Sequence, residues 1–219
     1  MSLPAAQISA EEATGADRAK FPGNPPRREA EPVASGASGR RFFRLRSTGH
    51  DRILMAYPAE PRENRLFADI AEVLGRNGIA VPKILARDDP RGLVWLEDLG
   101  ERDLYSIRND PAARKIFYPE ALRELLKIQQ LPADLFENSH TETLPPFDVE
   151  LYSFEHRYFA TEFLDRLVPA PAQSTYFQKQ MSALTTRLES SECVWVHRDF
   201  QSKNLMIDSK KRLRGVDFQ

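Results

Sequence analysis

Alternating apolar and polar positions mark the start of the regularly patterned part of the chain. Phe43 and Leu45 alternate with arginines, which is typical of a β-strand with two different faces. Residues 47–51 are turn-like, and residues 52–58 form a second strand-like run. The pattern predicts a β-hairpin that follows a loop of small residues.

A helical pattern follows over residues 61–78, where apolar side chains recur every three or four positions. These side chains are Leu66, Phe67, Ile70, Val73 and Leu74. Gly75 or Gly78 can end this helix. Two more strand-like runs, 81–89 and 92–100, meet at an Asp-Pro-Arg-Gly turn. The first half of the chain therefore predicts the order strand, strand, helix, strand, strand.

The second half is mostly helical in pattern. Asp110, followed by a proline, is a good N-cap, and Pro119 is expected to split that segment into two helices. Asp148 and Ser174 can each cap a further helix. The chain then returns to strands over 193–197, 204–208 and 212–218. Together the two halves predict an α+β protein.

The first 34 residues differ in composition from the rest. They hold five of the 16 prolines and one aromatic residue, Phe21, so they can bury little apolar surface. We expect a flexible N-terminal tail over 1–34, with a short helix starting near Ser9.

Composition then limits the class of protein. The chain has 219 residues, 41% hydrophobic and 29% charged, which allows a sizeable core in one domain or two small lobes. The net charge of −1 gives no basic field for coating nucleic acid. No apolar run approaches the roughly 20 residues of a membrane span, and no secretory signal opens the chain. We expect a cytoplasmic protein whose partners are neither nucleic acid nor membrane, and whose single Cys193 starts a buried strand.

The candidate catalytic residues lie near the end of the chain. His197-Arg198-Asp199 is followed by Asn204, which matches the kinase catalytic-loop pattern H-R-D-x-x-x-x-N. Asp217 and Phe218 stand where the usual Asp-Phe-Gly begins, with glutamine as the third residue. His197 is expected to brace the loop rather than transfer protons.

Hairpin geometry gives this spacing a physical reason. If 205–208 and 213–217 are antiparallel strands, Asn204 and Asp217 lie at the same end of the hairpin. Their amide and carboxylate oxygens suit Mg²⁺, which prefers hard oxygen ligands. Asp199 is then placed to accept the proton of an attacking hydroxyl. Phosphoryl transfer needs such positioning and charge neutralisation more than covalent chemistry.

Ordinary structural roles explain each of these residues taken alone. An asparagine before a strand and an aspartate in a turn are common capping residues. The three elements in order, with a hairpin between them and a small lobe before them, favour the catalytic interpretation.

Two further stretches are candidates for nucleotide binding. The loop that contains Gly36, Ser38 and Gly39 can cover phosphates with its backbone N–H groups. Backbone groups of Glu97 and Leu99 can pair with an adenine at the end of a strand. A plain small-residue loop and a plain linker between lobes are the alternatives.

At these residues the sequence resembles the aminoglycoside phosphotransferase family of small-molecule kinases. The stretches HRDFQSKN, VDFQ, SGASGRRFFRLR, LVWLEDLG and PPFDVELYSFEHRYF resemble its sugar-kinase branch, which acts on N-acetylmuramate and N-acetylglucosamine at the anomeric hydroxyl. The resemblance implies the bilobal protein-kinase-like fold, with a small antiparallel-sheet N-lobe over 35–98 and a mostly helical C-lobe over 99–219. It also implies ATP or GTP as donor, Mg²⁺, and a small-molecule hydroxyl as acceptor.

Carried over residue by residue, Asp199 matches the catalytic base of the family. Asn204 and Asp217 match the magnesium ligands, and Gly36 and Gly39 fall in the phosphate loop. Family members continue beyond the equivalent of Gln219, so the C-lobe of this chain is expected to be incomplete.

One family feature is missing. The kinase pattern expects a lysine in the strand after the glycine-rich loop, where it meets the nucleotide phosphates, and Met55 stands near that position. Phe67 stands about where its acidic partner is expected, and Glu63 lies one turn earlier. Phosphate charge must then be met by Mg²⁺, loop N–H groups, or an arginine such as Arg41 or Arg44.

Three functions remain open. An ATP-dependent sugar kinase is the first, and a nucleotide-binding pseudokinase or inactive fragment is the second, because of Met55 and the chain end. An aminoglycoside O-phosphotransferase is the third, and its polycationic substrates would favour an acidic acceptor site. The helix after Asp148 mixes acidic and basic residues, which slightly favours a neutral or anionic sugar.

Overall fold

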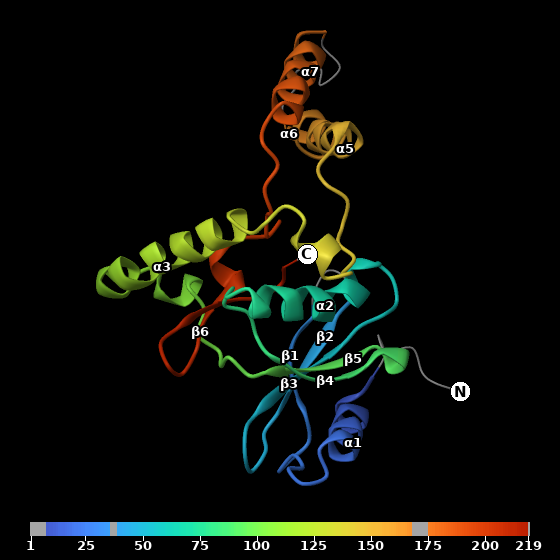
Figure 1. The fold of residues 1–219 in the computed structure, drawn as a ribbon, viewed down its shortest axis with the longest axis vertical. Coiled ribbons are helices and arrows are strands. Elements are labelled where there is room, and N and C mark those ends of the chain that lie inside the picture. Colours follow the sequence, from blue (N-terminus) through green and yellow to red (C-terminus); the bar gives the residue numbers. More distant parts are fainter. Residues whose placement is uncertain (1–7, 36–38, 168–174, 219) are drawn as a thin grey trace. The chain divides into compact units, whose positions relative to one another are not determined.

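A computed structural model describes residues 8–35, 39–167 and 175–218 (Figure 1). The chain divides into two compact units, residues 1–143 with 195–219 and residues 144–194. Every residue expected to take part in chemistry belongs to the first unit. The expected lobe boundary near residue 98 differs from this division and stays a prediction.

A five-stranded antiparallel sheet forms the centre of the first unit (Figure 1). Its strands are, in spatial order, β1 (Glu31–Ser35), β2 (Arg41–Leu45), β3 (Arg52–Ala56), β5 (Leu93–Glu97) and β4 (Ile84–Asp88). Phe43 of β2 lies opposite Leu54 of β3, so the predicted hairpin is confirmed. A 3₁₀ turn (Asp89–Arg91) joins β4 to β5, which confirms the second predicted pair of strands.

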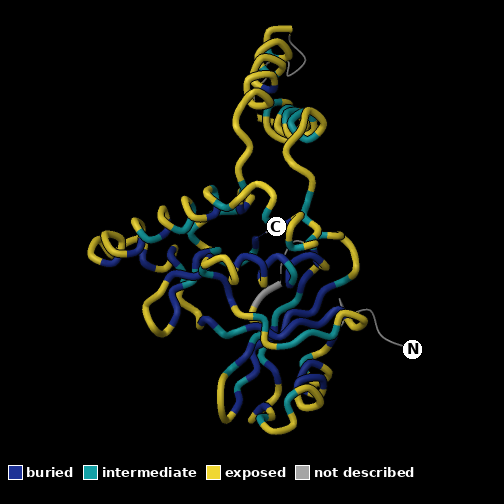
Figure 2. Tube along the Cα trace, viewed as in Figure 1, coloured by how far each residue is buried: buried dark blue, intermediate teal, exposed yellow. Residues whose placement is uncertain are grey.

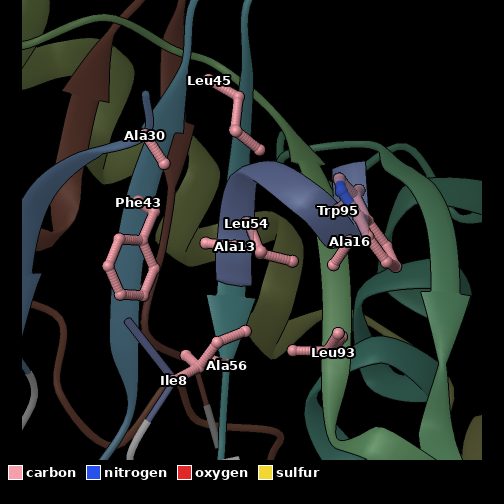
Figure 3. Close-up of a cluster of buried hydrophobic side chains, with 10 residues drawn as sticks. All are labelled: Ile8, Ala13, Ala16, Ala30, Phe43, Leu45, Leu54, Ala56, Leu93 and Trp95. Carbon is pink, nitrogen blue, oxygen red and sulfur yellow. The ribbon is translucent and has the colours of Figure 1, made fainter. Parts of the chain in front are cut away.

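One face of this sheet carries a closed apolar cluster. Figure 3 shows side chains from β2, β3 and β5 together with Ile8 and alanines from the N-terminal segment. Phe43, Leu54 and Trp95 are each exposed by 1% or less. Burying a large apolar side chain in this way contributes about 1.5–3 kcal/mol.

The short helix expected near Ser9 is confirmed, but the tail predicted over residues 1–34 is wrong for residues 10–20 and 31–35, which form a helix and a strand. Helix α1 (Ala10–Lys20) starts with a capping box between Ser9 and Glu12 and places Ala13 and Ala16 in the cluster. Asp17, fully buried, accepts two hydrogen bonds from Arg52 at 3.0 and 2.6 Å. The segment is held on the sheet by few apolar side chains, among them Ile8, two alanines of α1 and Phe21, together with this buried ion pair, so its low apolar content hid its packing.

Helix α2 (Glu63–Arg76) lies on the side of the sheet opposite α1 (Figure 1). All five of its predicted core side chains are buried, and Figure 2 shows dark-blue burial along much of the helix. The helix ends before Gly78, whose φ of +79° is readily adopted by glycine.

Helix α3 (Pro111–Gln129) corrects the prediction that Pro119 splits its segment. The Asp110 carboxylate caps it as expected, and the helix then runs through Pro119 without a break. Phe117 and Ala121, on either side of the proline, are buried in a cluster with residues of the C-terminal hairpin. This packing outweighs the backbone hydrogen bond that proline cannot donate.

The C-terminal hairpin is made of β6 (Leu205–Ile207) and β7 (Leu213–Gly215), as predicted. Residues 193–197 form no strand, which corrects a third expectation. Val194 and Val196 are exposed, and Trp195 packs on Phe136 of α4 (Leu135–Asn138). The apolar alternation is present, but no described strand pairs with this segment. Cys193 is accordingly exposed rather than buried.

The second unit is helical. It holds α5 (Val149–Phe159), a π-helical turn (Ala160–Leu164), α6 (Asp165–Leu167) and α7 (Thr175–Glu189). Asp148 accepts from the Leu151 amide at 2.8 Å, so this predicted cap is confirmed. Figure 2 shows both long helices exposed over most of their length. No helix among the described residues of the chain has the length and apolar character to cross a membrane.

Candidate active site

A short loop ahead of β6 holds Asp199, Gln201 and Asn204 together. Asn204 Nδ2 donates to the backbone oxygen of Asp199 at 3.1 Å and to its carboxylate at 2.7 Å. Gln201 Nε2 lies 3.0 and 2.9 Å from the two carboxylate oxygens. Backbone bonds within the loop and a 3₁₀ turn (Ser202–Asn204) fix its path. The half-buried Asp199 carboxylate is thus oriented by two side-chain amides.

The hairpin brings Asp217 to the same end as Asn204. Leu205 pairs with Gly215, and the Val216 amide donates to the backbone oxygen of Asn204 at 2.9 Å. The sequence predicted this juxtaposition from strand pairing alone. Asn204 therefore bonds to Asp199 on one side and lies beside the chain that leads to Asp217 on the other.

Two residues of this region have left-handed backbone angles. Arg198, just before Asp199, has φ +66°, and Asp217 has φ +57°. Such angles cost an L-residue roughly 1–2 kcal/mol and persist where the surrounding structure imposes them. Strain of this kind clusters at active sites, and here it falls beside both carboxylates of the candidate site.

Arg40 reaches Asp217 from the other end of the sequence. The two form an ion pair in which Arg40 Nη1 lies 3.0 Å from Asp217 Oδ1. The Arg40 side chain is 2% exposed, whereas the Asp217 side chain is 44% exposed. The carboxylate can therefore reach solvent or a ligand while the arginine stays in place.

Helix α2 supplies the other contacts of Arg40. Its Nε donates to Asn64 Oδ1 at 2.8 Å, and Nη2 donates to the Glu63 backbone oxygen at 3.2 Å. The guanidinium lies over the Phe67 ring, 5.4 Å from its centroid. Burial lowers the pKa of Arg40, and the nearby carboxylates of Asp217 and Glu63 oppose that shift.

The residues at the hairpin end fit a magnesium ion. Asn204 directs its amide nitrogen at Asp199, so its oxygen is the atom left to act as a ligand. Asp217 offers a partly exposed carboxylate beside it. No group of three or more His, Cys, Asp or Glu side chains suited to a metal occurs in the described part of the chain. Mg²⁺ commonly takes only one or two ligands from the protein, and water and phosphate oxygens complete its coordination shell.

His197 is buried beside the loop that carries Asp199, and its predicted bracing role stays a prediction. Its ring is 4% exposed and meets Phe200 and Phe218 edge-on, at centroid distances of 5.6 and 6.2 Å. Burial lowers the pKa of His197, and Asp199 and Asp217 pull it weakly upward. A neutral imidazole therefore packs here at neutral pH.

The predicted phosphate loop is only partly visible. Gly36 and Ser38 lie outside the described residues. Gly39 has φ +74°, and a Cβ atom there would lie 3.3 Å from the Pro58 side chain. Glycine is therefore favoured at this position both by its backbone angle and by limited space. The role of the loop in binding phosphate stays a prediction.

The predicted adenine contacts lie at the end of β5. The Glu97 amide donates to the Lys83 backbone oxygen at 2.9 Å, and the Leu99 side chain is buried. Between them, Asp98 accepts from Arg44 at 2.7 and 3.2 Å. This ion pair stiffens the segment, but it does not test adenine binding.

Neither arginine named for the missing lysine faces Asp217. Arg41 donates to the Ile8 backbone oxygen at 2.8 Å, and Arg44 is bound to Asp98. Met55 is fully buried. Arg40, Asn64 and Gln201 were not among the residues predicted from the sequence. The run of arginines after the loop indicated that one of them could lie beside Asp217. Residue type alone does not tell which arginine does so.

Comparisons with known proteins agree with this geometry. The sequence profile of the phosphotransferase enzyme family matches residues 29–219. The chain belongs to this family. It is 34% identical over 190 residues to the N-acetylmuramate/N-acetylglucosamine kinase of Pseudomonas putida, covering 85% of this chain and 53% of that protein. The same-named kinase of Pseudomonas aeruginosa is 30% identical over 201 residues, covering 90% and 56%.

Solved structures show the fold of this chain. Macrolide 2′-phosphotransferase type I superimposes with a TM-score of 0.58 at 14% identity, covering 95% of this chain and 71% of that one. Aminoglycoside phosphotransferase APH(4)-Ia, in complex with AMP-PNP and hygromycin B, gives 0.59 at 15% identity with the same coverages. The α+β, protein-kinase-like fold is therefore confirmed. The chain spans about half the length of the curated relatives it matches.

Proposed function

We propose that this phosphotransferase moves the γ-phosphoryl group of ATP to a hydroxyl of a sugar or amino sugar. The observation that carries the proposal is the Asp199 carboxylate, fixed by Asn204 at 2.7 Å and by Gln201. A carboxylate oriented in this way, next to an oxygen pair suited to Mg²⁺, is what phosphoryl transfer requires.

Each residue has a definite part in the proposed reaction. Asp199 accepts the proton as the acceptor oxygen forms its bond to the γ-phosphorus, and the bond to the β-phosphate oxygen breaks to release ADP. Asn204 and Asp217 would hold Mg²⁺, which would neutralise phosphate charge when bound. The positive φ at Asp217 points to a carboxylate whose direction is imposed by its surroundings.

The acceptor is proposed from the relatives. Two proteins that are 30% and 34% identical to this chain are named N-acetylmuramate/N-acetylglucosamine kinases. We therefore place these two amino sugars first among the acceptors, with the anomeric hydroxyl as the reacting group.

The test compares the parent with Asp199→Asn and with Asp134→Asn, an exposed aspartate at the start of α4. ADP release is measured with Mg·ATP and each amino sugar, and Mg·ATP binding is measured by calorimetry. We expect Asp199→Asn to lose at least a hundredfold in kcat while binding Mg·ATP as the parent does. Asp134→Asn is expected to behave as the parent.

Other outcomes separate the alternatives. Nucleotide binding without turnover of any acceptor would support a pseudokinase. Turnover of kanamycin but of neither amino sugar would support an aminoglycoside phosphotransferase. Full activity in Asp199→Asn would overturn the role of Asp199.

A further inference from the structure

We propose that Arg40 binds the phosphate groups of the nucleotide and takes the place of the absent strand lysine. The inference rests on the proposed function and adds to it a specific phosphate-binding residue. It depends on the contacts of Arg40, on the absence of an available cation among the residues of β3, and on the charges around Asp217.

Strand β3 has no cation to offer a phosphate. Met55, near the position expected for lysine, is fully buried. The strand has one charged residue, Arg52. Its guanidinium donates to the buried carboxylate of Asp17 in α1 and is therefore already engaged. A phosphate near Asp217 must therefore be met from another element.

Arg40 comes from the segment that joins the glycine-containing loop to β2. It follows Gly39 directly, so it stands at the return of the predicted phosphate loop. Its ion pair with Asp217 places the guanidinium beside the proposed magnesium ligand. One residue thus connects the predicted phosphate loop with the metal site.

The partner from helix α2 has also changed. The kinase pattern expects an acidic residue on this helix to hold the strand lysine, and here neutral oxygens of Asn64 and Glu63 hold Arg40. The amide oxygen of Asn64 and the backbone oxygen of Glu63 therefore orient the guanidinium without accepting its hydrogen bonds as full negative charges.

Hydrogen-bond counting leaves room for an anion. A guanidinium has five N–H groups, and its bonds to Asn64, Glu63 and Asp217 use three of them. Among the described residues, Nη1 and Nη2 therefore each keep one N–H group that these bonds do not use, and a phosphate oxygen can accept from such a group.

Charge balance links Arg40 to the magnesium nucleotide. Among the described residues, Asp217 is the one carboxylate within ion-pair distance of Arg40. When a cation shares that carboxylate, the buried guanidinium loses part of its neutralisation, and a phosphate oxygen restores it. Arg40 is therefore expected to favour the nucleotide in proportion to its phosphate charge.

A purely structural brace makes a different prediction. If Arg40 only holds Asp217 against α2, its loss weakens binding of every ligand through disorder of the site. If Arg40 binds phosphate, its loss weakens Mg·ATP strongly, Mg·ADP less, and adenosine not at all. The dependence on phosphate number therefore separates the two roles.

The experiment uses Arg40→Met, Arg40→Lys and the neighbouring Arg41→Met as the matched control. Arg41 donates to the Ile8 backbone oxygen and lies over Phe43, away from Asp217. Calorimetric titrations with Mg·ATP, Mg·ADP and adenosine are combined with thermal melts of each variant without ligand. We expect Arg40→Met to weaken Mg·ATP at least tenfold and to leave adenosine unchanged. Arg40→Lys is expected to fall between it and the parent, and Arg41→Met to match the parent.

Three results would overturn the inference. Parental affinity of Arg40→Met for Mg·ATP would exclude a phosphate contact. An equal loss for Mg·ATP and adenosine in both Arg40 variants would assign a structural brace. Absence of nucleotide binding in the parent itself would overturn the proposed function as well. The calorimetric titration of the parent shows this before any variant is made. If Arg40→Met does not fold, the same comparison in Arg40→Lys decides.

Discussion

Phe67 of α2 stacks on Phe218, with ring centroids 4.9 Å apart and ring planes 11° from parallel. Phe218 directly follows Asp217, so this stack ties the proposed magnesium ligand to the helix that also orients Arg40. Both rings are nearly fully buried, at 4% and 3% exposure. Helix α2 thus controls the candidate site through an aromatic contact and a guanidinium at once.

Replacement of Phe67 by alanine is expected to loosen both connections. Removing a buried phenyl ring costs about 3–5 kcal/mol of unfolding free energy, measured by urea denaturation. Mg·ATP affinity is expected to fall as well, because Asp217 and Arg40 both lose a neighbour. Phe154→Ala is the control, since that ring is 52% exposed. Unchanged nucleotide affinity in a folded Phe67→Ala would show that the stack does not position Asp217.

The ion pair between Asp17 and Arg52 is expected to anchor α1. Both side chains are buried, so Asp17→Ala leaves an unpaired guanidinium in the core and costs about 3–5 kcal/mol. Arg28→Ala, which breaks an exposed pair with Glu31, is expected to cost less than about 1 kcal/mol. Urea denaturation of both variants checks the difference. Equal small losses would mean that α1 contributes little to the stability of the sheet.

The case of α1 shows what sequence patterns could and could not predict. Strong periodicity in residues 61–78 and alternation around Phe43 predicted α2 and the first hairpin, because apolar spacing alone sets those elements. Helix α1 is held by alanines, by the flanking Ile8 and Phe21, and by Asp17, whose partner is 35 positions away. A buried pair of that kind is a tertiary contact and leaves no local pattern.

The same distinction applies to the candidate site. Asn204 and Asp217 were placed together from the sequence because hairpin pairing is local. Arg40 and Asp217 are 177 positions apart, and four arginines between 40 and 46 are indistinguishable in sequence. Packing selects Arg40, since Arg41 and Arg44 are engaged by Ile8 and Asp98.

Gln201 is expected to act as a positioning residue for Asp199. Its Nε2 bonds to both carboxylate oxygens, so Gln201→Ala frees the carboxylate to rotate. We expect kcat to fall about tenfold, a loss of roughly 1.4 kcal/mol, while KM for ATP changes little. Steady-state kinetics with the best acceptor measure this, and Gln130→Ala, at the exposed end of α3, is the control. A rise in KM for ATP at constant kcat would instead assign Gln201 to nucleotide binding.

Protonation of His197 is expected to make stability depend on pH. Burial lowers the pKa of His197 in the folded protein, whereas the unfolded chain has a pKa near 6.5. Between these two pKa values the unfolded state binds more protons than the folded state. The contribution of neutral His197 to the free energy of unfolding is therefore fully present above about pH 6.5, and it falls as the pH drops by at most about 1.4 kcal/mol per pH unit. His197→Gln is expected to flatten the slope between pH 7.5 and 5.5, and the exposed-loop variant His50→Gln to keep it. Urea denaturation across that range decides, and a parental slope in His197→Gln would assign the dependence to other groups.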